Sequence, residues 1–593
     1  MSYADRIESL RTLMRSRGWD AVILTGSDPH SSEYPSERWK QVQWLSGFTG
    51  ECGDVVVTLE HAGLWTDTRY FIQANEQLEG TGVALHKMRV PEQVPIPQWL
   101  AQTFSGSEPV IAIDGLCVSE AFVSEIRNAC AGCDMVSVPD LLSTLWQDRP
   151  AIPQTPIFTV DPGESRGKRL LRLRAWMSEN GCGWCLVSAL DEIAWLLDVR
   201  GSDIDYNPYV ISYLLVGEDS AYWYVLKEAV EDPVTEKTFD ELGADGIELR
   251  RYDDIEDAIG NLDEPLLIDS SVLNAHLCGV VREPVDRPNP VQMWKAVKNP
   301  VEVSGMKESH IKDGLAMEKF LYWLDKSMEN ERTVTEWDAS VKLGSLRAEI
   351  PEYRGDSFET ISAWGPGAAL PHYITPRTGA PVLEARGLYL CDSGGQYYSP
   401  ETFGGTTDIT RTVPLGPCTP LEMEDYTLVL KGHIGLAMAV FPYGTPGPRL
   451  DALSRIPLWS HKRNFGHGTG HGVGWFLGVH EGPHDIRQNM NPAGFVPGMV
   501  VSDEPGIYRE GQFGVRHENL LLCVDAGTND FGRWCRFEPL TLCHFDTSII
   551  VRELLTKDEL SWLNAYNSKV YDTLAPELPG PVAEWLRTKT AAI

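Results

Sequence analysis

The sequence predicts a mixed fold of α/β and α+β class, in which two copies of one α/β domain precede a domain of antiparallel strands and helices. At 593 residues the chain is too long for a single hydrophobic core. The order helix, glycine, apolar strand, loop and Trp-Leu helix occurs twice in the first half. After Pro300 the pattern changes to one long amphipathic helix, followed by short strands and Gly- and Pro-rich turns.

The repeat in the first half aligns without gaps over its best segment. "MRSRGWDAVILTGSD" (14–28) and "MSENGCGWCLVSALD" (177–191) match at a constant offset, which pairs Gly18 with Gly181 and the methionines and aspartates at the segment ends. Each copy follows a basic, Leu-rich helical pattern and continues to a Trp-Leu pair and a glycine. We interpret this as a duplicated domain. A chance likeness between two unrelated α/β segments is the alternative.

Proline-rich segments mark the expected domain boundaries. "DRPAIPQTP" (148–156) separates the two copies, and "EPVDRPNP" (283–290) closes the second. We therefore expect domains at 1–152, 153–298 and 299–593, the last with a C-terminal extension. The helix that opens the third domain carries apolar residues at helical spacing: Met306, Leu315, Phe320, Leu321, Leu324 and Met328.

Composition excludes several classes of protein. A formal net charge of −33 argues against nucleic acid or an anionic membrane as the main partner. The N-terminal segment lacks an apolar signal core, and no run approaches the roughly 18 apolar residues of a membrane span. We expect a cytoplasmic protein.

The 12 cysteines then read as reduced thiols. Two C-x-x-C pairs, Cys130/Cys133 and Cys182/Cys185, read as core residues rather than a zinc site, because zinc would need all four sulfurs to converge.

Candidate chemistry gathers between residues 370 and 520. Strand-like alternation directs Asp392, Asp408 and Glu518 toward an apolar face, and Glu504 ends an apolar strand. Buried carboxylates need a cation or a proton, since burial without a partner costs several kcal/mol. Each residue taken alone has an ordinary structural interpretation as a turn former, strand end or core residue. Together with one or two histidines, the four carboxylates are the ligand set of a two-metal hydrolytic site.

The glycine-rich stretch "NFGHGTGHGVG" (464–474) places His467 and His471 four residues apart. It reads either as a flexible loop or as a backbone shaped to present imidazoles to a metal.

The order of these residues, with their surrounding motifs, resembles a known family. The segments "LPHY", "CDSGGQY", "GTTDITRT", "FGHGTGHGVG", "VHEGP", "DEPGIY" and "RHEN", together with "WLSGFTG", "SALDEIAWLLDVRGSD" and "FEPLTL" outside the site, are similar to those of cytosolic-type aminopeptidase P in its long, three-domain form. This family belongs to the creatinase/prolidase/methionine aminopeptidase clan. The resemblance covers nearly the whole chain and implies two creatinase-type N-terminal domains followed by a pita-bread catalytic domain.

The resemblance also implies the roles of the site residues. Asp392 would chelate one ion, Asp408 and Glu518 would bridge two, and His471 and Glu504 would complete the second; manganese is the family's usual metal. Three further histidines would surround the ion pair and take part in catalysis: His372, His467 and His480. The implied reaction is hydrolysis of the bond between an N-terminal residue and a following proline, by attack of a hydroxide that bridges the ions, with Glu504 as proton acceptor.

The implied partners are peptides with proline in second position and a second copy of the chain in a homodimer. One departure is that Asp392 and Asp408 lie sixteen positions apart, where this family usually keeps about eleven; an extended loop tip is tolerated because closure costs grow slowly with length. What this tip touches, and whether Arg69 in "WTDTRYF" lies near a substrate channel or braces its own domain, stay open.

Three alternatives to the implied activity are weighed. A prolidase-type dipeptidase of the same fold would share most ligands, but the duplicated N-terminal half argues against it. Creatinase works without metals, which a complete ligand set disfavours. A catalytically dead pita-bread module that binds peptides would have lost metal ligands, and this chain keeps all five.

Overall fold

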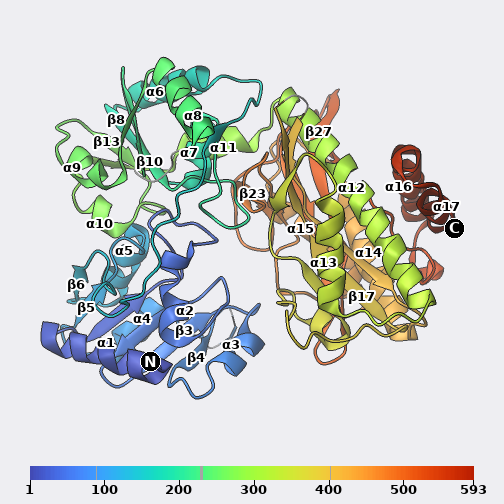
Figure 1. Cartoon of the computed structure of the whole chain (residues 1–593), viewed down its shortest axis with the longest axis horizontal. Helices are drawn as coiled ribbons and strands as arrows, with labels where there is room; N and C mark the ends of the chain where they lie inside the picture. The colour runs from blue at the N-terminus through green and yellow to red at the C-terminus, as the bar shows by residue number, and fades with distance from the viewer. Residues whose placement is uncertain (89, 92, 227–231, 401–402) are drawn as a thin grey trace. The chain divides into compact units, whose positions relative to one another are not determined.

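A computed structural model describes residues 1–593 except 89, 92, 227–231 and 401–402 (Figure 1). The chain forms two compact units, Met1–Val291 and Gln292–Ile593. Within the described residues, no helix combines the length and the apolar composition that crossing a lipid bilayer would require. The boundary expected after residue 152 lies inside the first unit, in the irregular segment between strands β6 and β7, and stays a prediction.

The first unit begins with a six-stranded sheet of order β4-β3-β2-β1-β5-β6. Its central strand β1 is buried on both faces: Val22 and Leu24 pack into one apolar cluster, and Ala21 and Ile23 into another. The strands are β1 (Ala21–Leu24), β2 (Asp54–Thr58), β3 (Ala62–Thr66), β4 (Ala84–Lys87), β5 (Val110–Ile113) and β6 (Asp134–Ser137). The helices are α1 (Tyr3–Arg17), α2 (Gln41–Ser46), α3 (Phe71–Gln77), α4 (Ile96–Thr103) and α5 (Glu120–Ala129).

A second six-stranded sheet in the same unit has the order β12-β11-β10-β8-β13-β14. Its strands are β8 (Trp184–Val187), β10 (Ser212–Gly217), β11 (Ala221–Val225), β12 (Ile247–Arg251), β13 (Leu266–Ile268) and β14 (Pro284–Asp286). Its helices are α6 (Arg166–Glu179), α7 (Leu190–Leu197), α8 (Pro233–Ala244), α9 (Ile255–Gly260) and α10 (Ala275–Cys278). The short strands β7 (Phe158–Thr159) and β9 (Val199–Arg200) pair beside it.

The two sheets confirm the predicted duplication. From the central strand outward, each sheet has two antiparallel pairings and then a parallel one on one side, and two parallel pairings on the other. Strands β1 and β8 begin and end at positions related by the sequence offset of the repeat. Gly18 and Gly181 both have φ of 70°, a left-handed conformation that favours glycine where the chain leaves α1 and α6.

The second unit opens with α12 (Pro300–Glu329), the predicted long helix, whose start is fixed by a capping box between Asn299 and Glu302. All six of its predicted apolar positions are buried. The other helices are α13 (Glu336–Arg347), α14 (Pro420–Ala437), α15 (Asp451–Ser460), α16 (Lys557–Leu574) and α17 (Gly580–Lys589). Helices α16 and α17 pack against α12 in the C-terminal extension.

Antiparallel sheets form the rest of this unit, as expected. A six-stranded sheet contains β21 (Val440–Pro442), β22 (Gly470–Gly472), β23 (Glu481–Ile486), β24 (Val500–Asp503), β27 (Asn519–Asn529) and β28 (Gly532–Pro539). Two three-stranded sheets contain β15 (Tyr353–Asp356), β18 (Gly395–Ser399) and β19 (Phe403–Thr406), and β16 (Ile361–Trp364), β17 (Leu388–Ser393) and β20 (Ile409–Pro414). Strands β25 (Gly506–Arg509) and β26 (Phe513–Arg516) form a hairpin.

This arrangement corrects one detail of the sequence analysis. Asp408 and Glu518 were expected within strands, but Asp408 lies between β19 and β20, and Glu518 lies between β26 and β27. At such breaks the side chain is not confined to one face of a sheet. Both carboxylates can therefore turn toward residues from neighbouring sheets.

Candidate metal centre

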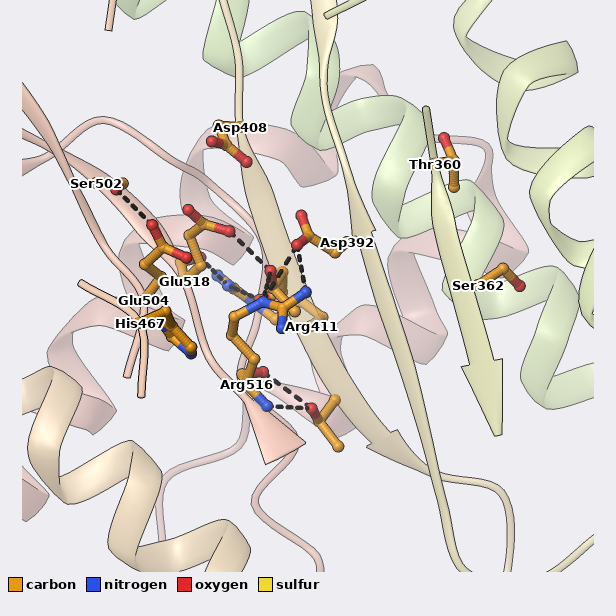
Figure 2. Close-up of polar contacts among 12 residues, drawn as sticks. Thr360, Ser362, Asp392, Asp408, Arg411, His467, Ser502, Glu504, Arg516 and Glu518 are labelled. Atoms are coloured by element: carbon orange, nitrogen blue, oxygen red, sulfur yellow. Dashed lines mark hydrogen bonds and ion pairs between the residues drawn. The ribbon is translucent and has the colours of Figure 1, made fainter. Parts of the chain in front are cut away.

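The five predicted ligands come from segments of the second unit that adjoin one another. Asp392 is on β17 and His471 on β22, and Glu504 directly follows β24. Ligand atoms of Asp408, His471 and Glu518 all lie within 4.8 Å of one another. The Nε2 of His471 is 3.4 Å from Asp408 Oδ2 and 3.4 Å from Glu504 Oε1. Figure 2 shows the four carboxylates approaching from these separate segments.

Backbone contacts set the orientation of His471. Its Nδ1 lies 3.0 Å from the carbonyl oxygen of Gly472, which can only accept a hydrogen bond, so Nδ1 carries the proton and Nε2 faces the carboxylates. The backbone N–H of His471 donates to Ser502 Oγ at 3.0 Å, and Ser502 Oγ in turn donates to Glu504 Oε1 at 3.1 Å. One serine thus links the backbone of His471 to the side chain of Glu504.

Arg516 supplies positive charge, but to one carboxylate. Its Nε lies 3.1 Å from Asp392 Oδ2, and its Nη2 contacts the same oxygen. Glu518 Oε2 instead accepts from the Thr410 hydroxyl at 2.7 Å. The other carboxylate oxygen of Asp392, Oδ1, is buried and has no hydrogen-bond partner among the residues that the structure describes. The negative charges therefore outnumber the cations that hold them.

The electrostatics of the cluster show the same excess. Burial, reinforced by the neighbouring Asp408 and Glu504 carboxylates, raises the pKa of Glu518 well above its usual range. Burial also raises the pKa of Asp392, despite Arg516. Burial raises the pKa of Glu504 to about 7, with Asp408 adding to the rise and His471 opposing it. Like charges this close ionise together only when cations join them, and oxygen ligands with one imidazole suit hard divalent ions.

The glycines of "NFGHGTGHGVG" make room for neighbouring strands. A Cβ at Gly470 would overlap the carbonyl oxygen of Ser502 on β24, and one at Gly472 would overlap that of Glu481 on β23. Both glycines belong to β22, which pairs with both strands. Residues 470–472 of this stretch therefore form a closely packed strand that presents His471.

The three other predicted histidines occupy different settings. His467 Nε2 contacts the Tyr508 hydroxyl at 2.7 Å, and this hydroxyl accepts from Arg516 Nη1 at 2.7 Å, so His467 is linked to Asp392. The His480 ring packs edge-on against His471, with centroids 4.3 Å apart. His372 lies in the turn after a short 3-10 helix, η3 (Gly365–Ala369), which packs against β26.

Several supporting residues had no sequence signal of their own. Tyr508, Thr410 and Ser502 are ordinary strand residues, and only their hydrogen bonds, to His467, Glu518 and Glu504 respectively, reveal that they support the site. Arg411, on β20, supports the site through the backbone. It donates to the backbone oxygen of Glu518 at 2.6 Å, and also to Asn519, Cys543, His544 and Tyr566. Arg411 thereby joins the Glu518 segment to the C-terminal extension.

The enlarged segment between Asp392 and Asp408 forms the hairpin of β18 and β19; residues 401–402 at its tip lie outside the described residues. Gln396 Nε2 donates to the carbonyl oxygen of Leu477 at 2.7 Å, and the Tyr398 ring stacks on Phe476 with centroids 5.1 Å apart. The base of the hairpin therefore supports the loop 473–480, which connects His471 to His480.

A second group in this unit also has the composition of a metal site: Glu318, Cys543 and His544. Here the carboxylate already has hydrogen-bond donors. Glu318 accepts from the backbone N–H of His544 at 2.8 Å and from its Nδ1 at 2.8 Å, and both side chains are buried. This pair connects α12 to the C-terminal region, and both carboxylate oxygens of Glu318 already accept hydrogen bonds within it.

Two other questions from the sequence have structural answers. Neither C-x-x-C pair belongs to a group of potential metal ligands within the described part of the chain, and all four thiols are free. Arg69 makes a bidentate contact with Asp67, in which Nε lies 2.9 Å from Oδ1 and Nη2 lies 2.9 Å from Oδ2, and it packs over Tyr70. Those contacts favour the interpretation that Arg69 braces its own domain.

Comparison with protein families agrees with this architecture. Residues 6–145 and 148–302 each match the creatinase/prolidase N-terminal domain, residues 304–525 match metallopeptidase family M24, and residues 533–593 match the C-terminal region of that peptidase. The duplication and the catalytic domain are thus recognised independently.

Whole proteins match along their full length. Aminopeptidase P1 of Arabidopsis thaliana is 36% identical, with 99% of each chain covered, and Xaa-Pro aminopeptidase 1 of Dictyostelium discoideum is 34% identical, with 97% of this chain and 94% of the relative covered. The crystal structure of X-prolyl aminopeptidase from Caenorhabditis elegans, described as a cytosolic enzyme with a di-nuclear active site, superposes with a TM-score of 0.94 at 33% identity over 100% of both chains. This chain therefore belongs to the aminopeptidase P family of M24 metallopeptidases.

Proposed function

We propose that this chain is a metal-dependent aminopeptidase that releases the N-terminal residue from peptides with proline in second position. The observation that carries the proposal is the gathering of four carboxylates and the Nε2 of His471, where Arg516 forms an ion pair with Asp392. The full-length likeness to Xaa-Pro aminopeptidases supports the choice of reaction.

The ligand set fits two divalent ions. Asp392 would hold one ion, Asp408 and Glu518 would be shared, and His471 and Glu504 would complete the second. Bound ions of this kind lower the pKa of a water molecule and polarise the scissile carbonyl group. The buried Asp392 Oδ1, which lacks a protein hydrogen bond among the described residues, is a ready ligand atom. We propose manganese as the metal, from the family resemblance.

Glu504 is the proposed proton acceptor. In the metal-free fold burial raises its pKa to about 7, and bound cations would lower this pKa and favour the carboxylate form that accepts a proton. Ser502 fixes one of its oxygens, and His471 Nε2 lies 3.4 Å away. Glu504 would therefore accept the proton of the attacking water at the place where the other ligands meet.

Histidines near the centre would serve the substrate. His480 or His372 would donate a hydrogen bond to the carbonyl oxygen as negative charge develops there, or assist protonation of the proline nitrogen. This nitrogen departs as a secondary amine, so a proton donor is required. His467, held by Tyr508, would face the substrate from the same strand region as His471. The acidic cluster would attract the free amine of the peptide, which is consistent with an exopeptidase.

The test is release of the first residue from peptides that begin Arg-Pro-Pro, with and without chelator and added manganese. We expect release that chelator abolishes and manganese restores. Activity that survives exhaustive chelation, or equal cleavage of a matched Arg-Ala-Pro peptide, would contradict the proposal. Cleavage of Xaa-Pro dipeptides with no action on Xaa-Pro-Xaa tripeptides would indicate a prolidase, and a purified chain that binds no metal would indicate a peptide-binding module.

Two further proposals concern the setting of the enzyme. A homodimer and a cytoplasmic location are expected from the family resemblance, and the Caenorhabditis elegans relative is described as cytosolic. Sedimentation at micromolar concentration tests the first, and fractionation of cells tests the second.

A further inference from the structure

A buried ionic cluster lies directly beside His480. Glu481, the next residue, has a side chain that is 1% exposed. Lys298 Nζ lies 2.6 Å from its Oε1, and Lys295 Nζ lies 3.0 Å from its Oε2, so each carboxylate oxygen faces its own ammonium group. Both lysine side chains are at most 1% exposed. Taking three charged groups out of water costs desolvation free energy, so general stability does not explain why the cluster is buried.

Both lysines come from the segment that leads into the catalytic unit. Lys295 is in α11 (Pro290–Ala296), and Lys298 lies just before α12. The backbone N–H of Lys298 donates to the carbonyl oxygen of Gly498 at 3.0 Å, and Asn299 caps α12. A lysine is usually a mobile surface residue, but the backbone of this segment is fixed on both sides of Lys298. The ammonium groups therefore act on Glu481 from a rigid base.

Glu481 lies where the strand pairing beside the metal centre is interrupted. His471 pairs with Asp485, but the next residue, Gly472, pairs with Glu481, so residues 482–484 bulge out of β23. A bulge of this kind redirects neighbouring side chains and is common next to active sites. At Gly482 an added Cβ would lie 2.7 Å from Gln292 Nε2, so α11 also contacts the bulge. His484 within the bulge is fixed by its Nε2, 2.7 Å from the carbonyl oxygen of Val500.

We infer that Lys295 and Lys298, by clamping the Glu481 carboxylate, are positioning residues that hold the His480 imidazole against His471 for catalysis. The backbone link is one peptide unit long, so a shift of Glu481 is passed directly to His480. The edge-on contact of the two rings, with centroids 4.3 Å apart, is the geometry that the clamp would preserve. The inference rests on the proposed function, because it assigns His480 a role in that reaction.

The sharpest variant is Lys298→Met, which keeps the length of the side chain and removes its charge. Lys295 still faces Glu481 in this variant, so the buried carboxylate keeps one cation and the fold is expected to persist. We expect kcat on an Arg-Pro-Pro peptide to fall about 10-fold or more, with KM changed by less than about twofold, because the lost interaction acts in the transition state. The matched control is Lys431→Met, which removes another partly buried lysine–glutamate pair, with Glu559 at 2.6 Å, and should leave kcat unchanged.

A double-mutant cycle separates positioning from general destabilisation. If the clamp acts through His480, then Lys298→Met should slow the His480→Ala enzyme by less than about twofold, although it slows the native enzyme at least 10-fold. Losses that multiply in the double variant, or an unchanged kcat in folded Lys298→Met, would overturn the inference. Lys295→Met replaces Lys298→Met in the same cycle if the latter does not fold.

A readout that needs no activity distinguishes failure of this inference from failure of the proposed function. A crystal structure of metal-free Lys298→Met should show the His480 ring displaced from its contact with His471, whereas metal-free Lys431→Met should keep it. An unmoved ring would contradict the clamp whatever reaction the protein catalyses. Absence of peptide cleavage by the native chain, together with a displaced ring in the variant, would contradict the proposed function alone.

Discussion

Two buried clusters in the catalytic unit combine carboxylates with an imidazole, and they differ in how the charges are balanced. In one, Glu318 accepts both the ring N–H and the backbone N–H of His544, so one acid meets one base. In the other, four carboxylates approach His471, and among the described residues Arg516 forms an ion pair with one of them, Asp392. The composition of the two groups is similar, but their hydrogen bonding is not.

The difference shows which cluster requires an ion. A buried pair that satisfies its own hydrogen bonds is stable without a ligand, and adding a cation would displace the imidazole proton. A cluster of like charges is stable only with protons or cations, and this need is seen in the raised pKa values of Asp392, Glu504 and Glu518. Unbalanced charge, more than residue type, therefore marks the metal centre.

The largest expected effect is that of Glu504→Gln. The amide cannot accept a proton, so turnover of Arg-Pro-Pro peptides should fall about 10³-fold or more, while circular dichroism shows an intact fold. Glu510→Gln, at an exposed position after β25, is the control and should retain full activity. Near-native rates in Glu504→Gln would remove Glu504 from the role of proton acceptor.

Removal of metal should destabilise the catalytic unit. If ions at about 1,000 times their dissociation constant stabilise the fold by about 4 kcal/mol, chelation should lower the melting temperature by several degrees, and manganese should restore it. Differential scanning calorimetry measures the melting temperature of the chelated protein and of the manganese-loaded protein. A melting temperature that changes with neither chelator nor manganese would contradict the conclusion that the four-carboxylate cluster requires an ion.

Glu318→Gln breaks the satisfied pair and should cost about 3 kcal/mol of stability, because His544 loses the carboxylate that faces it in a buried site. Its kcat per folded molecule should match that of the native enzyme. Denaturant titration and peptide assays on the same sample test this contrast. A stable variant that loses activity would mean that the pair serves the reaction directly.

The smallest expected effect is on the pH dependence of the metal-free protein. The pKa of Glu504 is about 7 in the fold, against an ordinary value of 4.5, so protonated Glu504 is favoured in the native state. The associated stability is present below pH 4.5 and is lost as pH rises to about 7, a loss of about 2 kcal/mol between pH 5 and 7. Asp392 and Glu518 add in the same direction. Denaturant titrations in chelator should show this fall, and manganese should cancel it; a rise with pH would contradict it.

The sequence predicted the architecture where periodicity and repetition were strong. The duplicated strands β1 and β8 and the helix α12 were readable, because burial imposes fixed spacing on a strand or helix. The set of five candidate ligands came from the family resemblance. The positions of Asp408 and Glu518 could not be predicted precisely, because both lie at strand breaks that local sequence patterns do not mark. Contacts such as Tyr508 with His467, or Lys298 with Glu481, join residues far apart in the chain and follow only from the tertiary fold.

The measurement that tests the central comparison most directly is the metal content of two variants, Glu518→Gln and Glu318→Gln, beside the native chain after dialysis against manganese. Each change removes one carboxylate charge from one of the two buried clusters. We predict about two manganese ions per native chain, the same number in Glu318→Gln, and less than one in Glu518→Gln. Full occupancy in Glu518→Gln, or loss of manganese in Glu318→Gln, would contradict the assignment of the metal centre to the unbalanced cluster.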